Sequence, residues 1–234
     1  MKALILAAGL GKRLGLQNIP KPMYKLAGKP ILEHNILLLR KHNIREICIN
    51  LHHFPEVIKK YFNDGSNWGV KIQYSFEKEL LGTSGAVKNI ESFWDKKRFF
   101  IVYGDNYTNV NLTEMLSAHL STKSLATIAI FDPSKTVNSG VAGGYILLDQ
   151  NNKILSFTEG KRSQIGGYVN AGVYILEPAI LDMIPNKAFS DFGKDIFPEV
   201  INKGFLLTGY VTSDFVMAVD TKEALDLTEK TLSG

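Results

Sequence analysis

The sequence predicts an α/β protein whose core is a doubly wound, mostly parallel, Rossmann-like sheet, extended by a smaller mixed sheet. Three observations predict this class. Short apolar runs alternate with segments of helical period through the first half of the chain. The stretches AAGLGKR and GDN follow two of these runs, where such sheets bind their ligands. In the second half, closely spaced apolar runs separated by short turns predict neighbouring strands.

In the first half, each apolar run is expected to form a strand and each intervening segment a helix. The first run, residues 2–8, precedes a long loop and a helix over residues 30–42 that starts at a proline. The pattern then repeats. Further strands are expected at residues 45–50, 70–76 and 98–105, with helices at residues 55–62 and 83–93. This alternation is typical of a parallel sheet with helices on both faces.

The second half is expected to add the mixed sheet. The expected strands are residues 126–131 and the segments GGYILLD, KILSFTE and GGYVNAGVYIL, followed by a strand near residues 205–211. Helices are expected near residues 112–120, near residues 192–202 and from Lys222 onward. Since no repeat, linker or low-complexity tract interrupts the chain, residues 1–234 are expected to form one domain with lobes of about 1–110 and 111–234.

The composition excludes several classes of protein. The apolar runs are much shorter than the ~20 residues of a membrane span, and the start of the chain lacks a signal-peptide cleavage site. A cytoplasmic protein without a membrane partner is therefore expected. The single cysteine, Cys48, excludes an internal disulfide and a cysteine-based metal cluster.

The net charge of +4 is weak evidence for nucleic acid, and no such partner is expected. The six basic residues before the first acidic one, Glu33, indicate either a cleft that attracts a small polyanion or a solvated basic face. These residues are Lys2, Lys12, Arg13, Lys21, Lys25 and Lys29.

The loop after the first strand, AAGLGKRLG, contains the glycines and basic residues of a phosphate-binding loop. It is not a Walker loop, because no GxxxxGK precedes a Ser or Thr. Leu14 replaces the third glycine of a dinucleotide fingerprint, and Pro20 and Pro22 prevent a regular helix. A glycine turn could instead bring backbone N–H groups close to a triphosphate, with Arg13 on phosphate oxygens and Lys21 returned to the same cleft by the PKP segment.

The run LILAAGLGKRLG, followed by IPKPMYKLAGKPILEH, resembles the sugar-1-phosphate nucleotidyltransferases. Their signature is a Gly-rich loop with an arginine, followed by a Pro-Lys-Pro-hydrophobic segment. The resemblance covers nearly the whole chain and is greatest to short guanylyltransferases acting on mannose- or heptose-1-phosphate. It implies a GT-A-like fold with a sugar-binding extension, an NTP and a sugar-1-phosphate as substrates, and Mg²⁺ as cofactor. A homo-oligomer is a possible state.

The resemblance also assigns residues to the site. The residues that the resemblance assigns to nucleotide binding are Leu6, Ala7, Ala8, Gly9, Gly11, Lys12, Arg13, Lys21, Leu80, Gly82, Thr83 and Gly85. Sugar binding falls to Asn106, Gly144, Glu159, Lys161 and Asn170. The implied catalytic residues are Arg13, Lys21, Asp105 and Lys161. Two positions depart from the family pattern: Leu80 stands where proline is usual, and Gly160 separates Glu159 from Lys161.

The expected metal ligands are Asp105 and Asp220. Asp105 follows a buried strand, as the family's metal-binding Asp does. The family's second Asp lies two residues before Gly-Thr-x-Glu, but FVMAVDTKEAL places Ala218 there and Asp220 at the glycine. Residues 218 and 220 of an extended segment point to the same side, so Asp220 could still reach the metal. Alternatively, Asp220 caps the helix that begins near Lys222.

The activity implied by the resemblance is attack of a sugar-1-phosphate oxygen on the α-phosphorus of the NTP, with release of pyrophosphate. GTP is the preferred nucleotide, and a UTP- or dTTP-dependent enzyme is the alternative, because such enzymes use nearly the same loops. A non-catalytic nucleotide-sugar sensor of the same fold stays open because of Ala218.

Overall fold

A parallel half-sheet forms the first part of the computed structural model, which describes residues 1–9, 19–138, 144–160, 167–219 and 222–233. β1 (Lys2–Leu6) pairs with β4 (Glu46–Leu51) on one side and with β6 (Phe99–Tyr103) on the other. β5 (Lys71–Phe76) extends the sheet beyond β4. All of these pairings are parallel, so the carboxyl ends of the four strands lie at one edge.

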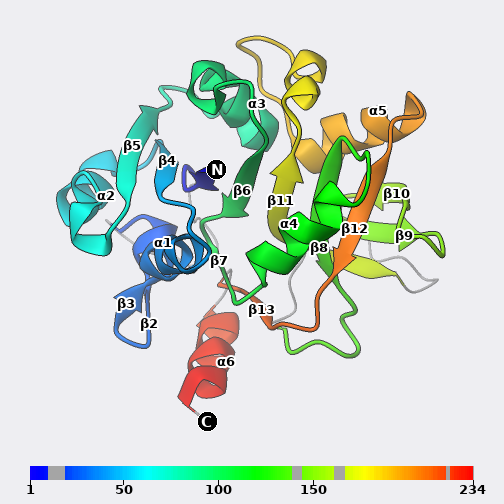
Figure 1. The fold of residues 1–234 in the computed structure, drawn as a ribbon. Helices are drawn as coiled ribbons and strands as arrows, with labels where there is room; N and C mark the ends of the chain where they lie inside the picture. The colour runs from blue at the N-terminus through cyan, green and yellow to red at the C-terminus, as the bar shows by residue number, and fades with distance from the viewer. Residues whose placement is uncertain (10–18, 139–143, 161–166, 220–221, 234) are drawn as a thin grey trace.

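Helices cover both faces of this half-sheet, because β1 presents apolar side chains alternately to each face. Ala3 and Ile5 belong to one buried cluster, which includes residues of the first, second and fourth helices, while Leu4 belongs to the cluster that includes the third. The helices are α1 (Ile31–Lys41), α2 (Pro55–Phe62), α3 (Gly82–Asn89) and α4 (Leu112–Leu120). Figure 1 shows α1 and α4 in front of the sheet. The doubly wound arrangement predicted from the sequence is confirmed.

The second half continues the same sheet with mixed pairing. β11 (Tyr168–Leu176) runs antiparallel to β6 and so joins the two halves. It also pairs antiparallel with β8 and β9, while β12 runs parallel to β8. The remaining elements of this half are β8 (Ala126–Phe131), β9 (Tyr145–Leu148), β10 (Ile154–Thr158), the 3₁₀ segment η5 (Pro178–Met183), the π-helical turn η6 (Phe192–Ile196), α5 (Phe197–Asn202) and β12 (Leu207–Val211).

Two expected helices differ in detail from the prediction. The helix expected over residues 83–93 ends at Asn89, because Ile90 leaves the helical region, and a 3₁₀ turn η4 (Glu91–Trp94) follows. The helix expected over residues 192–202 begins with the π-helical turn η6. Pro198 near the start of α5 has no N–H to donate to a carbonyl of the preceding turn.

Two small sheets were not predicted. β2 (Lys25–Leu26) and β3 (Lys29–Pro30) follow the short 3₁₀ turn η2 (Lys21–Met23). β7 (Asn106–Thr108) pairs antiparallel with β13 (Val216–Ala218), which brings the end of the chain beside the end of β6. The last helix, α6 (Lys222–Ser233), lies at one end of the molecule (Figure 1) and packs through Leu225 against Leu26 and Ile31. The remaining 3₁₀ turn, η3 (Ser66–Trp68), lies between α2 and β5.

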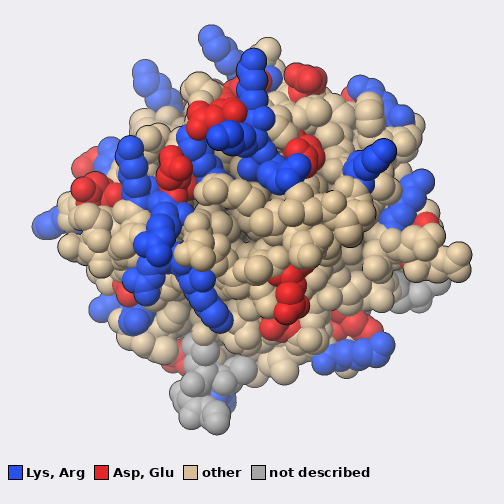
Figure 2. Space-filling view, in the orientation of Figure 1, with Lys and Arg blue, Asp and Glu red and all other residues tan. Residues whose placement is uncertain are grey.

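The basic residues at the start of the chain do not all surround one cleft. Lys2 lies at the amino end of β1, where its ammonium group is 2.7 Å from Asp95 and 3.8 Å from Glu46. It therefore lies at the opposite edge of the sheet from Lys21. On the face drawn in Figure 2, Asp and Glu side chains are interspersed among the Lys and Arg side chains.

Among the described residues, no helix is long and apolar enough to cross a membrane.

Candidate active site

A cavity of about 230 Å³ opens at the carboxyl edge of the parallel strands. From β1 the chain continues to β4 and β5 on one side and then returns to β6 on the other, so the strand order reverses between β1 and β6. Such a reversal leaves a crevice where α/β sheets bind ligands. The predicted site residues that line this cavity are Leu6, Ala7, Ala8, Gly9, Lys21, Leu80, Gly82, Thr83 and Asp105.

Lys21 and Asp105 form an ion pair in this cavity. Pro20 and Pro22 hold Lys21 in the turn η2, and its side chain is only 7% exposed. Its Nζ atom lies 2.6 Å from Oδ2 of Asp105, which is two residues beyond the end of β6. The carboxylate is 36% exposed and lines the cavity. A buried ammonium group beside a partly exposed carboxylate can hold phosphate oxygens and a divalent cation together.

A buried pair, Asn50 and Glu77, connects the two walls of the cavity, and neither residue was predicted. The Asn50 side chain accepts a hydrogen bond from the Ala7 N–H (2.7 Å) and donates one to Glu77 Oε1 (2.8 Å). Glu77 Oε2 accepts the Leu81 N–H at 3.1 Å. Both side chains line the cavity and are 3% exposed. The available signal was a polar residue near the carboxyl end of each of two parallel strands.

The glycines at the start of α3 make room for a segment from the second half of the chain. We call residues 188–191 the strap. Gly82 has a φ of +75°, and a side chain there would run into the Ser190 carbonyl; at Gly85 a Cβ would lie 2.8 Å from the Ala188 carbonyl oxygen. Gly82 lines the cavity. Gly85 lies against the strap, which leaves no room for a side chain at this position. Its predicted nucleotide contact stays a prediction.

Glu159, a predicted sugar-binding residue, lies between two glycines. A side chain at Gly193 would run into its carboxylate, and one at Gly144 would run into Phe157 and approach the same carboxylate. Burial raises the pKa of Glu159, and the negative charge of Asp191 raises it further. Glycine at both positions therefore leaves space for an acidic acceptor in a partly buried place.

The two predicted sugar-binding asparagines make internal hydrogen bonds. Asn170 donates to the Tyr174 hydroxyl (2.7 Å) and accepts from the Gly172 N–H, while Asn106 donates to the Ala171 carbonyl (3.2 Å). Both are buried. The Asn106 bond joins β7 to β11, whereas both Asn170 bonds lie within β11. The contact of either asparagine with a sugar stays a prediction.

Several predicted residues lie outside the described part of the chain: Gly11, Lys12, Arg13, Lys161 and Asp220. The structure does place Ala218 beside the site. Ala218 pairs with Asn106, and the next residue, Val219, donates its N–H to the Asp105 carbonyl at 3.2 Å. Position 218, where the family resemblance expects a second carboxylate, is therefore next to Asp105. In this chain the residue there is alanine, which has only a methyl group.

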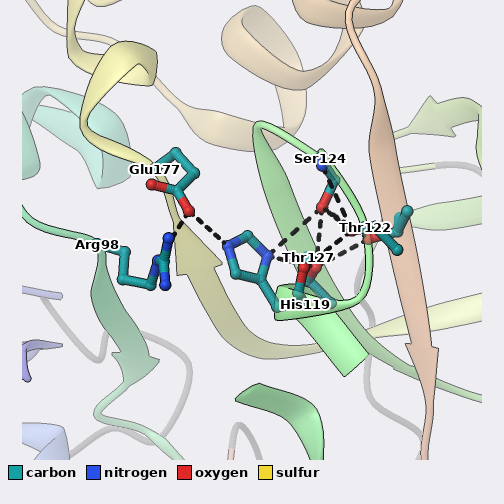
Figure 3. Close-up of polar contacts among 7 residues, drawn as sticks. Arg98, His119, Thr122, Ser124, Thr127 and Glu177 are labelled. Atoms are coloured by element: carbon teal, nitrogen blue, oxygen red, sulfur yellow. Dashed lines mark hydrogen bonds and ion pairs between the residues drawn. The ribbon is translucent and has the colours of Figure 1, made fainter. Parts of the chain in front are cut away.

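A second polar cluster resembles a catalytic triad, because a histidine lies between a serine and a glutamate. His119 contacts Ser124 Oγ at 3.4 Å through Nδ1 and Glu177 at 3.1 Å through Nε2, and Arg98 donates to the same Glu177 oxygen (Figure 3). His119 is 2% and Ser124 3% exposed, and neither lines the cavity that contains Lys21 and Asp105. Burial lowers the pKa of His119, which the hydrogen bond to Glu177 opposes. The cluster provides partners for buried polar groups where α4, β8 and β11 meet.

The fold and the cavity define a nucleotide-binding α/β protein. The family model for nucleotidyl transferases matches residues 2–220, and the chain belongs to this family.

Among its relatives, the UTP–glucose-1-phosphate uridylyltransferase of Synechocystis is 36% identical over 87% of this chain and 56% of the relative. The D-glycero-alpha-D-manno-heptose 1-phosphate guanylyltransferase of Campylobacter jejuni is 36% identical over 78% of each chain. The chain thus spans about half the length of several curated relatives that it matches. The crystal structure of HddC from Yersinia pseudotuberculosis complexed with GMP-PN is 26% identical, with a TM-score of 0.81 over 99% of both chains.

Substituting Gly82 and Gly28 by alanine should separate steric conflict from backbone strain. Both glycines have a left-handed φ, +75° and +79°, but only Gly82 has a backbone oxygen in the way, whereas Gly28 has nothing within 4 Å. We expect Gly28→Ala to lower the free energy of unfolding by about 1–2 kcal/mol. Gly82→Ala should lower it by about 1–3 kcal/mol more, because the strap must move. Urea denaturation measures both, and equal losses would contradict the packing role of Gly82.

Proposed function

We propose that the protein transfers a nucleotidyl group from a nucleoside triphosphate to a sugar-1-phosphate and releases pyrophosphate. The observation that carries this proposal is the Lys21–Asp105 pair, 2.6 Å apart in a cavity at the point where the strand order reverses. The family match and the activities named for the relatives support it. The similarity to these relatives also supports a cytoplasmic location and a role in making precursors for polysaccharides.

The proposed transfer reaction depends on how the two substrates are positioned and does not need a strong general base. An oxygen of the sugar-1-phosphate is already anionic and attacks the α-phosphorus, while the bond from this phosphorus to the β-phosphate oxygen breaks. The protein must therefore bring two anions together in line and offset their charge. Lys21 supplies a positive charge inside the cavity, and the loop after β1 supplies backbone N–H groups at Ala8 and Gly9. Arg13 and Lys161 are proposed to bind the triphosphate and the sugar phosphate.

The site fits Mg²⁺ held partly by substrate. Among the described residues, no group of three His, Cys, Asp or Glu side chains could enclose a metal. Mg²⁺, however, commonly uses one or two carboxylates together with phosphate oxygens and water. Asp105 offers one such carboxylate at the cavity, and Asp220 is the proposed second ligand. When bound, the cation would neutralise charge on the phosphate oxygens.

Guanine is the base that we propose. Glu77 is a buried carboxylate on the cavity wall, and each of its oxygens accepts one internal hydrogen bond and can accept a second from a donor on the base. Guanine presents adjacent N1–H and N2–H₂ donors, whereas uracil and thymine present one N–H between two carbonyl acceptors. Heptose- and mannose-1-phosphate guanylyltransferases among the relatives support GTP with mannose- or heptose-1-phosphate. A UTP-dependent activity is the alternative, given the Synechocystis relative.

A non-catalytic nucleotide-sugar sensor is favoured by one observation, the methyl group of Ala218 beside Asp105. A sensor would bind nucleotide without releasing pyrophosphate, so the two functions differ in a single assay.

Pyrophosphate release tests the proposal. Purified protein with Mg²⁺ should release pyrophosphate only when both a nucleoside triphosphate and a sugar-1-phosphate are present. We expect the highest kcat/KM with GTP and mannose- or heptose-1-phosphate in a panel that includes UTP, CTP and dTTP. Thermal stabilisation by nucleotide without pyrophosphate release from any pair would contradict transfer and indicate the sensor.

Changing Glu77 to Gln should reduce the preference for guanine. The amide offers a donor toward the base and removes the negative charge, so kcat/KM for GTP should fall about 10–100-fold, while that for UTP changes less. Glu79→Gln is the matched control, because Glu79 is exposed and two residues away. If Glu77→Gln lowered kcat/KM equally for every nucleotide, Glu77 would only position the cavity wall.

Replacing Lys21 by Met should lower kcat more than it weakens nucleotide binding. The variant keeps the buried aliphatic stem and removes the charge beside Asp105. Loss of one group that stabilises transition-state charge costs about 10²–10³ in kcat. Steady-state kinetics with GTP, compared with Lys25→Met on the exposed part of β2, measures the effect. Near-normal turnover of Lys21→Met would contradict the assigned role.

A further inference from the structure

Phe189 is an exposed aromatic ring at the cavity. It lines the cavity together with Gly82 and Thr83, yet 65% of its surface is exposed. This is the largest exposed fraction among the large apolar side chains in the described part of the chain. Single exposed apolar residues are common on proteins, so exposure alone has no meaning. The position of this ring on a cavity wall makes it a candidate ligand contact.

Hydrogen bonds fix the backbone at the residue that follows Phe189. The Ser190 N–H donates to the Leu81 carbonyl (2.9 Å), and the Ser190 carbonyl accepts the N–H groups of Ser84 and Gly85. The hydroxyl groups of Ser84 and Ser190 lie 2.7 Å apart. These contacts hold the strap to the start of α3, so Phe189 projects from an ordered segment.

The next residue of the strap is equally constrained. Thr83 donates its hydroxyl hydrogen to Asp191 at 2.8 Å and accepts the Phe192 N–H at 2.9 Å. Asp191 also accepts the N–H groups of Gly193 and Lys194. The side chain of Asp191 is therefore used to hold the strap, which leaves Phe189 as the strap residue available to a ligand.

The cavity that Phe189 lines has both apolar and ionic walls, and its acidic residues include Glu77 and Asp191. Leu6, Ala7, Ala8 and Leu80 supply apolar surface, while Lys21 and Asp105 mark the place for phosphates. A ligand with a flat apolar part and a charged part would fill both regions. A nucleoside triphosphate has this shape.

We propose that Phe189 is a nucleoside-binding residue whose ring stacks on the base of the bound nucleotide. This proposal rests on the proposed function and extends it to a residue of the second half of the chain. Every base has a π face, so stacking adds affinity without selecting the base. Phe189 and Glu77 thus have separate roles: Phe189 holds the base by its face, and Glu77 recognises its edge.

Nucleotide binding without sugar-1-phosphate tests the proposal. Calorimetry uses whichever of GTP, UTP, CTP and dTTP binds the wild-type protein most tightly, with Mg²⁺ present. Phe189→Ala should raise Kd about 10-fold, and Phe189→Tyr should restore it to within about 3-fold of wild type. The matched control is Phe205→Ala, since Phe205 is also exposed (51%) but does not line the cavity. The Kd ratio between nucleotides should stay unchanged in Phe189→Ala.

A Phe189→Trp variant gives a readout that does not depend on activity. Its additional tryptophan emission, relative to wild type, should change when the same nucleotide binds. An unchanged Kd in Phe189→Ala, or emission that responds to sugar-1-phosphate alone, would overturn the proposal. Absence of nucleotide binding to the wild-type protein would overturn it as well. Nucleotide binding without pyrophosphate release would remove the proposed transfer reaction and leave the role of Phe189 intact.

Discussion

The parallel pairing of β1 between β4 and β6 determines where this protein can bind a charged ligand. Parallel strands end at the same edge, and the reversal of strand order between β1 and β6 leaves that edge open. Three polar groups of the cavity lie at these ends: Asn50 in β4, Glu77 after β5 and Asp105 after β6. The middle of β1, β4 and β6 is buried and apolar, so these three strands present polar side chains at their ends.

The second constraint is that the cavity is completed by both halves of the chain. β11 joins the halves into one sheet, and the strap then returns from the second half to the start of α3. Gly82 and Gly85 allow this close approach, because any side chain there would meet the strap. Packing of the strap therefore brings Phe189 to a cavity whose charged residues belong to the first half.

The sequence predicted the parts of the site that depend on short spacing. The separation of Gly9 from Lys21, with Pro20 and Pro22 around the lysine, indicated that the lysine returns to the loop, and the structure places both residues on the same cavity. Asp105 was predicted from the family resemblance, because YGDN places it at the end of a buried strand as the family's metal-binding Asp is. Glu77 and Asn50 were missed, since their roles depend on a hydrogen bond between residues 27 positions apart on neighbouring strands.

By itself, the sequence determined the order of the main strands and helices, the two faces of the sheet and the return of Lys21 toward Gly9. Periodicity and local turns encode these features, because each depends on residues close together along the chain. Only the tertiary structure decided that the strap covers α3, that Phe189 faces the cavity and that Ala218 lies beside Asp105. These contacts join residues about a hundred positions apart, as Thr83 and Asp191 do across 108, and no local pattern specifies which distant segments will meet.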